Sequence, residues 1–173
     1  MSLSSVTLAL RNVIQAAIPA KVEVTTLPLA LAEKFVKLGA WLARVNIVCH
    51  QVSPSPNLRN ISLTRIDSPA IHGSKASPLN ALYLITVYGT PSPEQEQSTE
   101  HLLESIYRAF DQKPLLTSAD LEAALPGIPG GSAQASARIV LQALSFAETE
   151  SLFTSMKATH RPTLAYQVTV ADE

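Results

Sequence analysis

The residues of this sequence best suited to nucleophilic chemistry are its single cysteine and the histidine that follows it. Cys49 and His50 offer a thiol and a base, which is the pair that thiol enzymes use. Neighbouring residues on a strand point to opposite faces, so this imidazole is badly placed to activate this thiol. Because Cys49 lies in an apolar row, we interpret it as a small core residue. A thiol hydrolase using Cys49 stays open as a less favoured alternative.

The remaining candidates for a metal or phosphate site lack the spacing that such sites need. The four histidines form neither a His-Glu-x-x-His motif nor a two-histidine-one-carboxylate set: His50, His72, His101 and His160. We expect His160 at a helix C-terminus, where it would meet the helix dipole. The segment 127–131 lacks the Gly-Lys-Ser/Thr ending of a phosphate loop, and Pro129 removes one amide. We therefore predict no catalytic residue, no metal and no cofactor.

Periodicity indicates which elements must position these residues. Apolar residues at three- and four-residue spacing predict helices, over 6–18, 93–111, 118–125 and 146–156. The last of these opens with a capping box, Ser145 to Glu148. Alternation predicts strands, over 22–24, 43–52, 78–88, 135–145 and 164–170. Residues 29–42 are ambiguous, although 30–37 allow a helical turn or two.

Strands and helices do not alternate strictly along the chain, which disfavours a doubly wound parallel sheet. We predict one α+β domain over residues 1–173, with a mostly antiparallel or mixed sheet of about four to five strands and helices packed on it. In the strand over 43–52, Val45, Ile47, Cys49 and Gln51 are expected on one face; Asn46, Val48, His50 and Val52 are expected on the other. The prolines of Ser53–Pro56 are expected to end this strand.

Residues 53–78 form the longest stretch without clear periodicity. A run of this length without secondary structure is uncommon inside a small domain and is usually functional or mobile. Residues 60–66 alternate between apolar and polar, so part of the stretch fits an arm that pairs as a strand. We treat 53–78 as a long arm or loop of the domain.

The overall composition excludes several classes of partner. The net charge is −1 and the 13 basic residues are spread without a cluster, which argues against nucleic acid. No stretch approaches the roughly 20 apolar residues of a membrane span. The first residues lack the positive charge of a secretory signal, and one cysteine allows no internal disulfide, so we expect a chain made in a reducing cytoplasm. Only 16% of residues are charged, which mildly favours a protein that lives in an assembly.

Five segments in a fixed order carry a resemblance to a known family. The first segment, 45–60, reads as a strand ending in Gln-Val, followed by a proline/asparagine turn and then Leu-Arg-Asn. The other four segments are 78–89 (Pro-Leu-Asn-Ala-Leu-Tyr-Leu-Ile-Thr-Val-Tyr-Gly), Pro114–Thr117, Leu144–Ser145 and Leu164–Val168. Over about residues 3–170, the series resembles the cap (tail-terminator) proteins of phage-tail-like contractile injection systems, of the antifeeding-prophage and Photorhabdus virulence cassette type. The sequence departs from the pattern at Cys49 and His50, where Leu-Tyr is expected, and at Ser77, where a proline or arginine is common.

The resemblance implies a structural protein that is not an enzyme and needs no cofactor. Such proteins form a six-fold ring on the end of the inner tube away from the baseplate, stop tube growth and hold the last sheath layer. The implied partners are further copies of the chain, the inner tube protein and the sheath protein, without nucleic acid or membrane. The chain would be made in the bacterial cytoplasm and belong to a particle that can be released from the cell. A non-enzymatic adaptor or small-molecule binding module is the alternative.

Two surfaces are expected to make the contacts of such a ring. The hypothesis for the arm is that it meets a neighbouring subunit or the tube through Arg59, Asn60, Ile61, Leu63 and Arg65. Arg59 is the candidate polar anchor, because a guanidinium can hold a carboxylate with two hydrogen bonds. The second expected surface is the edge of the last strand, 164–170, which would offer its backbone to a neighbour.

Overall fold

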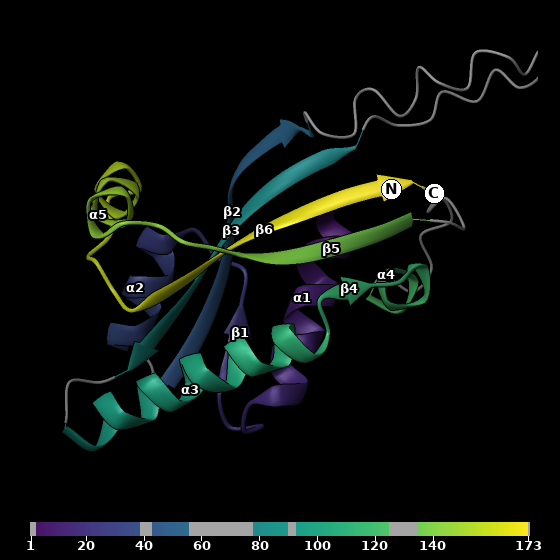
Figure 1. The fold of residues 1–173 in the computed structure, drawn as a ribbon. Coiled ribbons are helices and arrows are strands. Elements are labelled where there is room, and N and C mark those ends of the chain that lie inside the picture. The colour runs from purple at the N-terminus through teal and green to yellow at the C-terminus, as the bar shows by residue number, and fades with distance from the viewer. Residues whose placement is uncertain (1–2, 39–42, 56–77, 90–92, 125–134, 173) are drawn as a thin grey trace, which may run out of the picture.

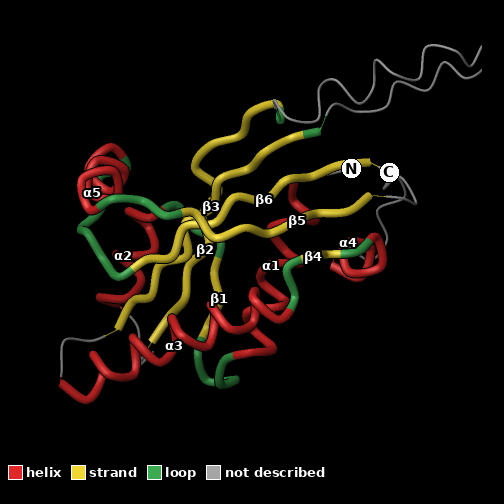
Figure 2. The backbone as a smooth tube through the Cα atoms, in the orientation of Figure 1, coloured by secondary structure: helices red, strands yellow, loops and turns green. Residues whose placement is uncertain are grey.

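The computed structural model describes residues 3–38, 43–55, 78–89, 93–124 and 135–172 (Figures 1 and 2). The helices are α1 (Leu3–Ala17), α2 (Leu29–Leu38), α3 (Pro93–Gln112), α4 (Ser118–Ala124) and α5 (Phe146–Ser155). The strands are β1 (Glu23–Thr25), β2 (Ala43–Pro54), β3 (Leu79–Gly89), β4 (Leu115–Leu116), β5 (Ala135–Gln142) and β6 (Thr163–Asp172). The ambiguous stretch from residue 29 thus contains a helix, and 39–42 lie outside the described residues.

The strands form one mixed sheet in the order β1-β2-β3-β6-β5-β4. Only β1 and β2 run parallel, and all other neighbours are antiparallel. The predicted α+β fold with a mixed sheet is confirmed. The sheet has one strand more than predicted, because the two residues of β4 are too few to show any alternation.

The larger core lies on one face of the sheet, under α1, α3 and α4 (Figure 1). Val6, Leu10 and Ile14 follow the three- and four-residue spacing of α1 and are at most 1% exposed. The buried face of α3 carries Ile106 and Phe110, and the Phe110 ring packs edge-on against Tyr166 at 4.9 Å. This face supplies most of the buried apolar surface that stabilises the fold.

The opposite face is covered at one end by α2 and α5 (Figure 1). Leu29 of α2 and Phe153 of α5 pack there on Leu84 and Ala165 of the sheet. The predicted capping box starts α5: the Ser145 hydroxyl accepts a hydrogen bond from the Glu148 amide, and the Glu148 carboxylate accepts one from the Ser145 amide. The hydrogen bonds between Ser145 and Glu148 therefore determine where α5 begins on this face.

A bulge in β2 changes which side chains share a face. The register with β3 shifts between Cys49 and Gln51, so His50 has no direct partner. Gln51 pairs with Leu82 and Val52 with Ala81, which puts these two residues on the faces opposite to those expected from simple alternation. The predicted faces were wrong beyond Cys49, because one extra residue reverses every later side chain of a strand.

The predicted end of β2 was also too early. The strand continues through Ser53 to Pro54, which lies opposite Leu79, and the Ser55 amide donates to the Pro78 carbonyl at 2.8 Å. β1 pairs with β2 only over residues 44–46, so Pro54 has a strand neighbour on one side only. A proline is tolerated there because its missing amide falls on an unpaired edge.

Candidate interface

Residues 56–77 of the arm predicted to make contacts lie outside the described residues, and with them Arg59, Asn60, Ile61, Leu63 and Arg65. The structure places the two residues from which the arm departs. Ser55 is 2% exposed, and its hydrogen bond to Pro78 joins the two ends of the arm at the tip of the β2–β3 hairpin. Ser55 and Pro78, the described residues on either side of 56–77, therefore lie side by side.

Cys49 lies on the core face of β2, opposite Tyr83, and is half-buried against the larger core. Burial raises the pKa of its thiol, although hydrogen bonds with the Gln51 carbonyl and the Tyr83 side chain act in the other direction. The thiol donates to the Gln51 carbonyl at 3.6 Å. Burial also lowers the pKa of His50. A nucleophilic cysteine needs a depressed pKa, so this environment works against the thiol-hydrolase alternative.

The other described histidines contact carboxylate or aromatic groups. His101 is exposed on α3, with Nδ1 3.8 Å from the Glu104 carboxylate. His160 packs against the rings of Phe146 and Phe153, with centroid distances of 5.2 and 5.3 Å. The prediction that His160 ends a helix was wrong, because α5 stops at Ser155 and Lys157 takes a positive φ of 54°. Within the described ranges, no three His, Cys, Asp or Glu side chains lie together as metal ligands would.

The last strand is not an edge of the sheet. β6 pairs with β3 on one side and β5 on the other, so the predicted contact through its edge was wrong. β5 has the open edge instead. Its outer side meets β4 only at Ala137 and Arg138, and the Ile139 amide donates to the Pro114 carbonyl. No described strand pairs with the outer side of residues 140–142.

Apolar side chains surround this open edge on both faces. Of the seven exposed large apolar side chains among the described residues, three lie on β5 or on its neighbour β4, and two lie on α3 and α5, the helices that precede β4 and follow β5 in the chain. We call these five the β5 edge patch: Tyr107, Leu115, Val140, Leu141 and Phe146. Val140 and Leu141 are 46% and 47% exposed and point to opposite faces. Leu141 pairs with Tyr166 of β6.

Sequence reasoning missed the β5 edge patch, although a signal was present. All of residues 139–144 except Gln142 are apolar, so both sides of the alternation are mostly apolar, which by itself indicates a strand covered on both faces. The structure leaves Val140 and Leu141 about half exposed instead. An apolar, unpaired strand edge is the kind of surface that associates with another chain.

Two solved structures share this fold over the full length of the chain. One is the sheath/tube terminator of the extracellular contractile injection system PVC in its extended state, with 16% identity and a TM-score of 0.64. The other is the anti-feeding prophage cap (AFP tube terminating cap), with 15% identity and a TM-score of 0.66. Each match covers 100% of this chain and 57% or 56% of the other chain, so the chain spans little more than half the length of either. The fold is that of tube terminators.

The family follows from the sequence itself. The model of the Pvc16 N-terminal domain matches residues 5–172, and the chain belongs to this family. No curated protein matches the sequence. Among the described helices, none is long and apolar enough to cross a membrane.

Proposed function

We propose that this chain is a structural cap on the distal end of the inner tube of a contractile injection particle. It forms a homohexameric ring, ends tube growth and holds the last sheath layer, and its partners are further copies of itself, the inner tube protein and the sheath protein. The observation that carries the proposal is the fold, which matches two terminator proteins over all of this chain. Membership of the Pvc16 N-terminal domain family supports it independently.

The role is structural and not enzymatic. The thiol of Cys49, the best candidate for a nucleophile, has a raised pKa and donates a hydrogen bond to the Gln51 backbone carbonyl. A cap needs surfaces and no reacting groups, so the proposal assigns no catalytic residue, metal or cofactor to this chain. It is made in the bacterial cytoplasm and leaves the cell as part of the particle.

Two surfaces make the ring and tube contacts in this proposal. The β5 edge patch binds the neighbouring copy, since it combines an unpaired strand edge with exposed apolar side chains on both faces. The arm over 53–78 adds contacts through Arg59, Asn60, Ile61, Leu63 and Arg65. Both ends of the arm sit at one hairpin tip, so its deletion leaves the sheet pairing intact.

The test is assembly with the inner tube protein, measured by light scattering for mass and by electron microscopy for tube length. The wild-type chain should form a species of six times 18.5 kDa, alone or on tube ends, and should stop tube elongation. Leu141→Lys should reduce ring formation at least about tenfold, because it puts a charge where an apolar side chain is buried by a neighbour. Deletion of 56–76 should leave a folded chain that does not assemble.

Leu31→Lys is the matched control. Leu31 is 43% exposed on α2, away from β5, so the same change of side chain there should leave assembly unchanged. Equal losses in both variants would contradict the assignment of the β5 edge patch. A wild-type chain that neither forms rings nor alters tube length would contradict the capping role itself.

A further inference from the structure

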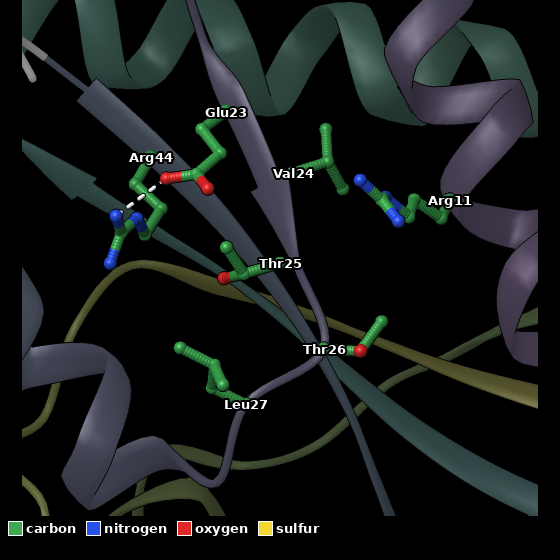
Figure 3. Close-up of a pocket in the computed structure, with 7 residues that line it drawn as sticks. All are labelled: Arg11, Glu23, Val24, Thr25, Thr26, Leu27 and Arg44. Atoms are coloured by element: carbon green, nitrogen blue, oxygen red, sulfur yellow. Dashed lines mark hydrogen bonds and ion pairs between the residues drawn. The ribbon is translucent and has the colours of Figure 1, made fainter.

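A shallow pocket of about 330 Å³ lies at the other end of the sheet, along β1 (Figure 3). The pocket is lined by residues 23–27, by Arg11 from α1 and by Arg44 from β2. The pocket therefore follows an edge strand and does not sit between packed layers. Nothing in the capping proposal uses it.

β1 is the end strand of the sheet and pairs only with β2. The opposite side of its backbone carries amides and carbonyls that no described strand pairs with. The chain beyond β1 is kept beside the sheet by Asn46, whose side chain accepts a hydrogen bond from the Leu27 amide at 2.9 Å and donates one to the Leu27 carbonyl at 2.8 Å. The strand part of this edge covers three residues, Glu23–Thr25, or roughly 10 Å, and Asn46 holds Leu27 just beyond it.

The charges at this edge leave an excess of one positive charge. The Arg44 side chain is 8% exposed and forms an ion pair with Glu23 at 2.5 Å, so these two charges offset one another. Arg11 is exposed and has neither a hydrogen bond nor an ion pair with any described residue. Figure 3 shows the Arg11 guanidinium on the opposite side of β1 from the Arg44–Glu23 pair.

This arrangement matches the geometry of an added strand. Successive side chains of a strand point to opposite faces, so a segment paired with β1 would present one row of side chains to Arg11 and the other row to Glu23 and Arg44. An acidic side chain suits the first row, because it meets an unpaired cation. A doubly charged free anion suits the pocket less well, since the Glu23 carboxylate lines the same space.

We propose that the β1 edge binds an extended, acidic segment of a partner protein by strand addition, with a carboxylate of the segment paired to Arg11. The site is separate from the β5 edge patch and from the arm. The proposal does not depend on the capping role, because it concerns the chemistry of one edge only.

The test is a titration of the ¹⁵N-labelled chain with an amidated, acetylated hexapeptide, Thr-Val-Glu-Val-Thr-Ser, followed by NMR. The amide signals of Glu23 to Leu27 should shift, and amide exchange in β1 should slow, because an added strand takes up the outward backbone groups. The peptide with Gln in place of Glu should bind about fivefold more weakly, which is the most that an exposed ion pair contributes. Arg11→Gln should remove this difference between the two peptides.

Lys34→Gln, which removes an exposed positive charge from α2, is the control and should keep the preference for Glu. Three results would overturn the proposal: no shift of the β1 signals at millimolar peptide, equal binding of the two peptides to the wild-type chain, or the same shifts from inorganic phosphate alone. None of these results bears on tube capping, so the two proposals fail separately.

Discussion

Replacing Asn46 with alanine tests how the β1 edge is held in place. Asn46 is fully buried, and its side chain makes three hydrogen bonds to the neighbouring segment, one with the Thr25 hydroxyl and two with the Leu27 backbone. A hydrogen bond contributes about 1 kcal/mol net. Losing three should lower the free energy of unfolding by about 3 kcal/mol. A domain of ordinary stability, about 5–15 kcal/mol, stays folded after such a loss.

Urea unfolding followed by circular dichroism measures this loss. Asn80→Ala is the matched control, because Asn80 is only half-buried and its side chain accepts one hydrogen bond, from the Thr169 hydroxyl at 2.9 Å. We expect the control to cost about 1 kcal/mol. Hydrogen exchange of the 25–27 amides should also accelerate in Asn46→Ala. If Asn46→Ala lowers the free energy of unfolding no more than Asn80→Ala does, then water replaces the hydrogen bonds to the Leu27 backbone without loss of stability, and the reasoning is refuted.

Three further predictions concern caps and titrating groups. Ser145→Ala should cost about 1 kcal/mol in urea unfolding, because it removes the N-cap of α5, whereas Ser145→Asp should keep most of the stability. Burial raises the pKa of three tyrosines to about 12: Tyr83, Tyr88 and Tyr166. The neutral form of these tyrosines is favoured in the folded state, so their contribution to stability is complete below pH 10 and is lost as the pH rises towards 12. Absorbance at alkaline pH should show that three tyrosines ionise late. Ionisation of all tyrosines near the ordinary pKa of 10 would contradict this prediction. The raised pKa and partial burial of Cys49 should make its alkylation by iodoacetamide at pH 8.5 at least about tenfold slower in the native chain than in urea, and equal rates would contradict this.

Elements with strong local signals were predictable from the sequence. The spacing of Val6, Leu10 and Ile14 located α1, and the Ser145 capping box located the start of α5. The bulge at His50 was not predictable, because it is a property of the pairing between β2 and β3 and not of either strand alone. The helix α2 was ambiguous for another reason: its ten residues are amphipathic, but they follow Pro28 directly and make a short segment in which periodicity is harder to read.

The surfaces were harder to predict than the elements, because a surface depends on the order of strands in the sheet. The last strand in sequence need not be an edge strand of the sheet, and β6 lies between β3 and β5. The apolar residues of β5 were visible in the sequence, but their exposure follows from the two-residue length of β4. Arg44 and Asn46, polar residues within a mostly apolar strand, were the local signs that something is held beside β2.

The two open edges of the sheet differ in chemistry, and this difference constrains the proposed ring. The β5 edge is apolar, with Val140 and Leu141 on its two faces, whereas the β1 edge is lined by charged and hydroxyl side chains.

A contact between two β5 edges would be self-complementary and would stop at a dimer, because each copy uses the same patch. A closed ring needs a contact between two different surfaces, repeated around the axis. In a hexamer, the β5 edge patch of one copy must therefore meet another surface of the next. The β1 edge is a poor match for it, since the apolar patch would bury the charge of Arg11 without a partner. The proposed ring contact and the proposed acidic-segment site would thus use separate surfaces of the sheet.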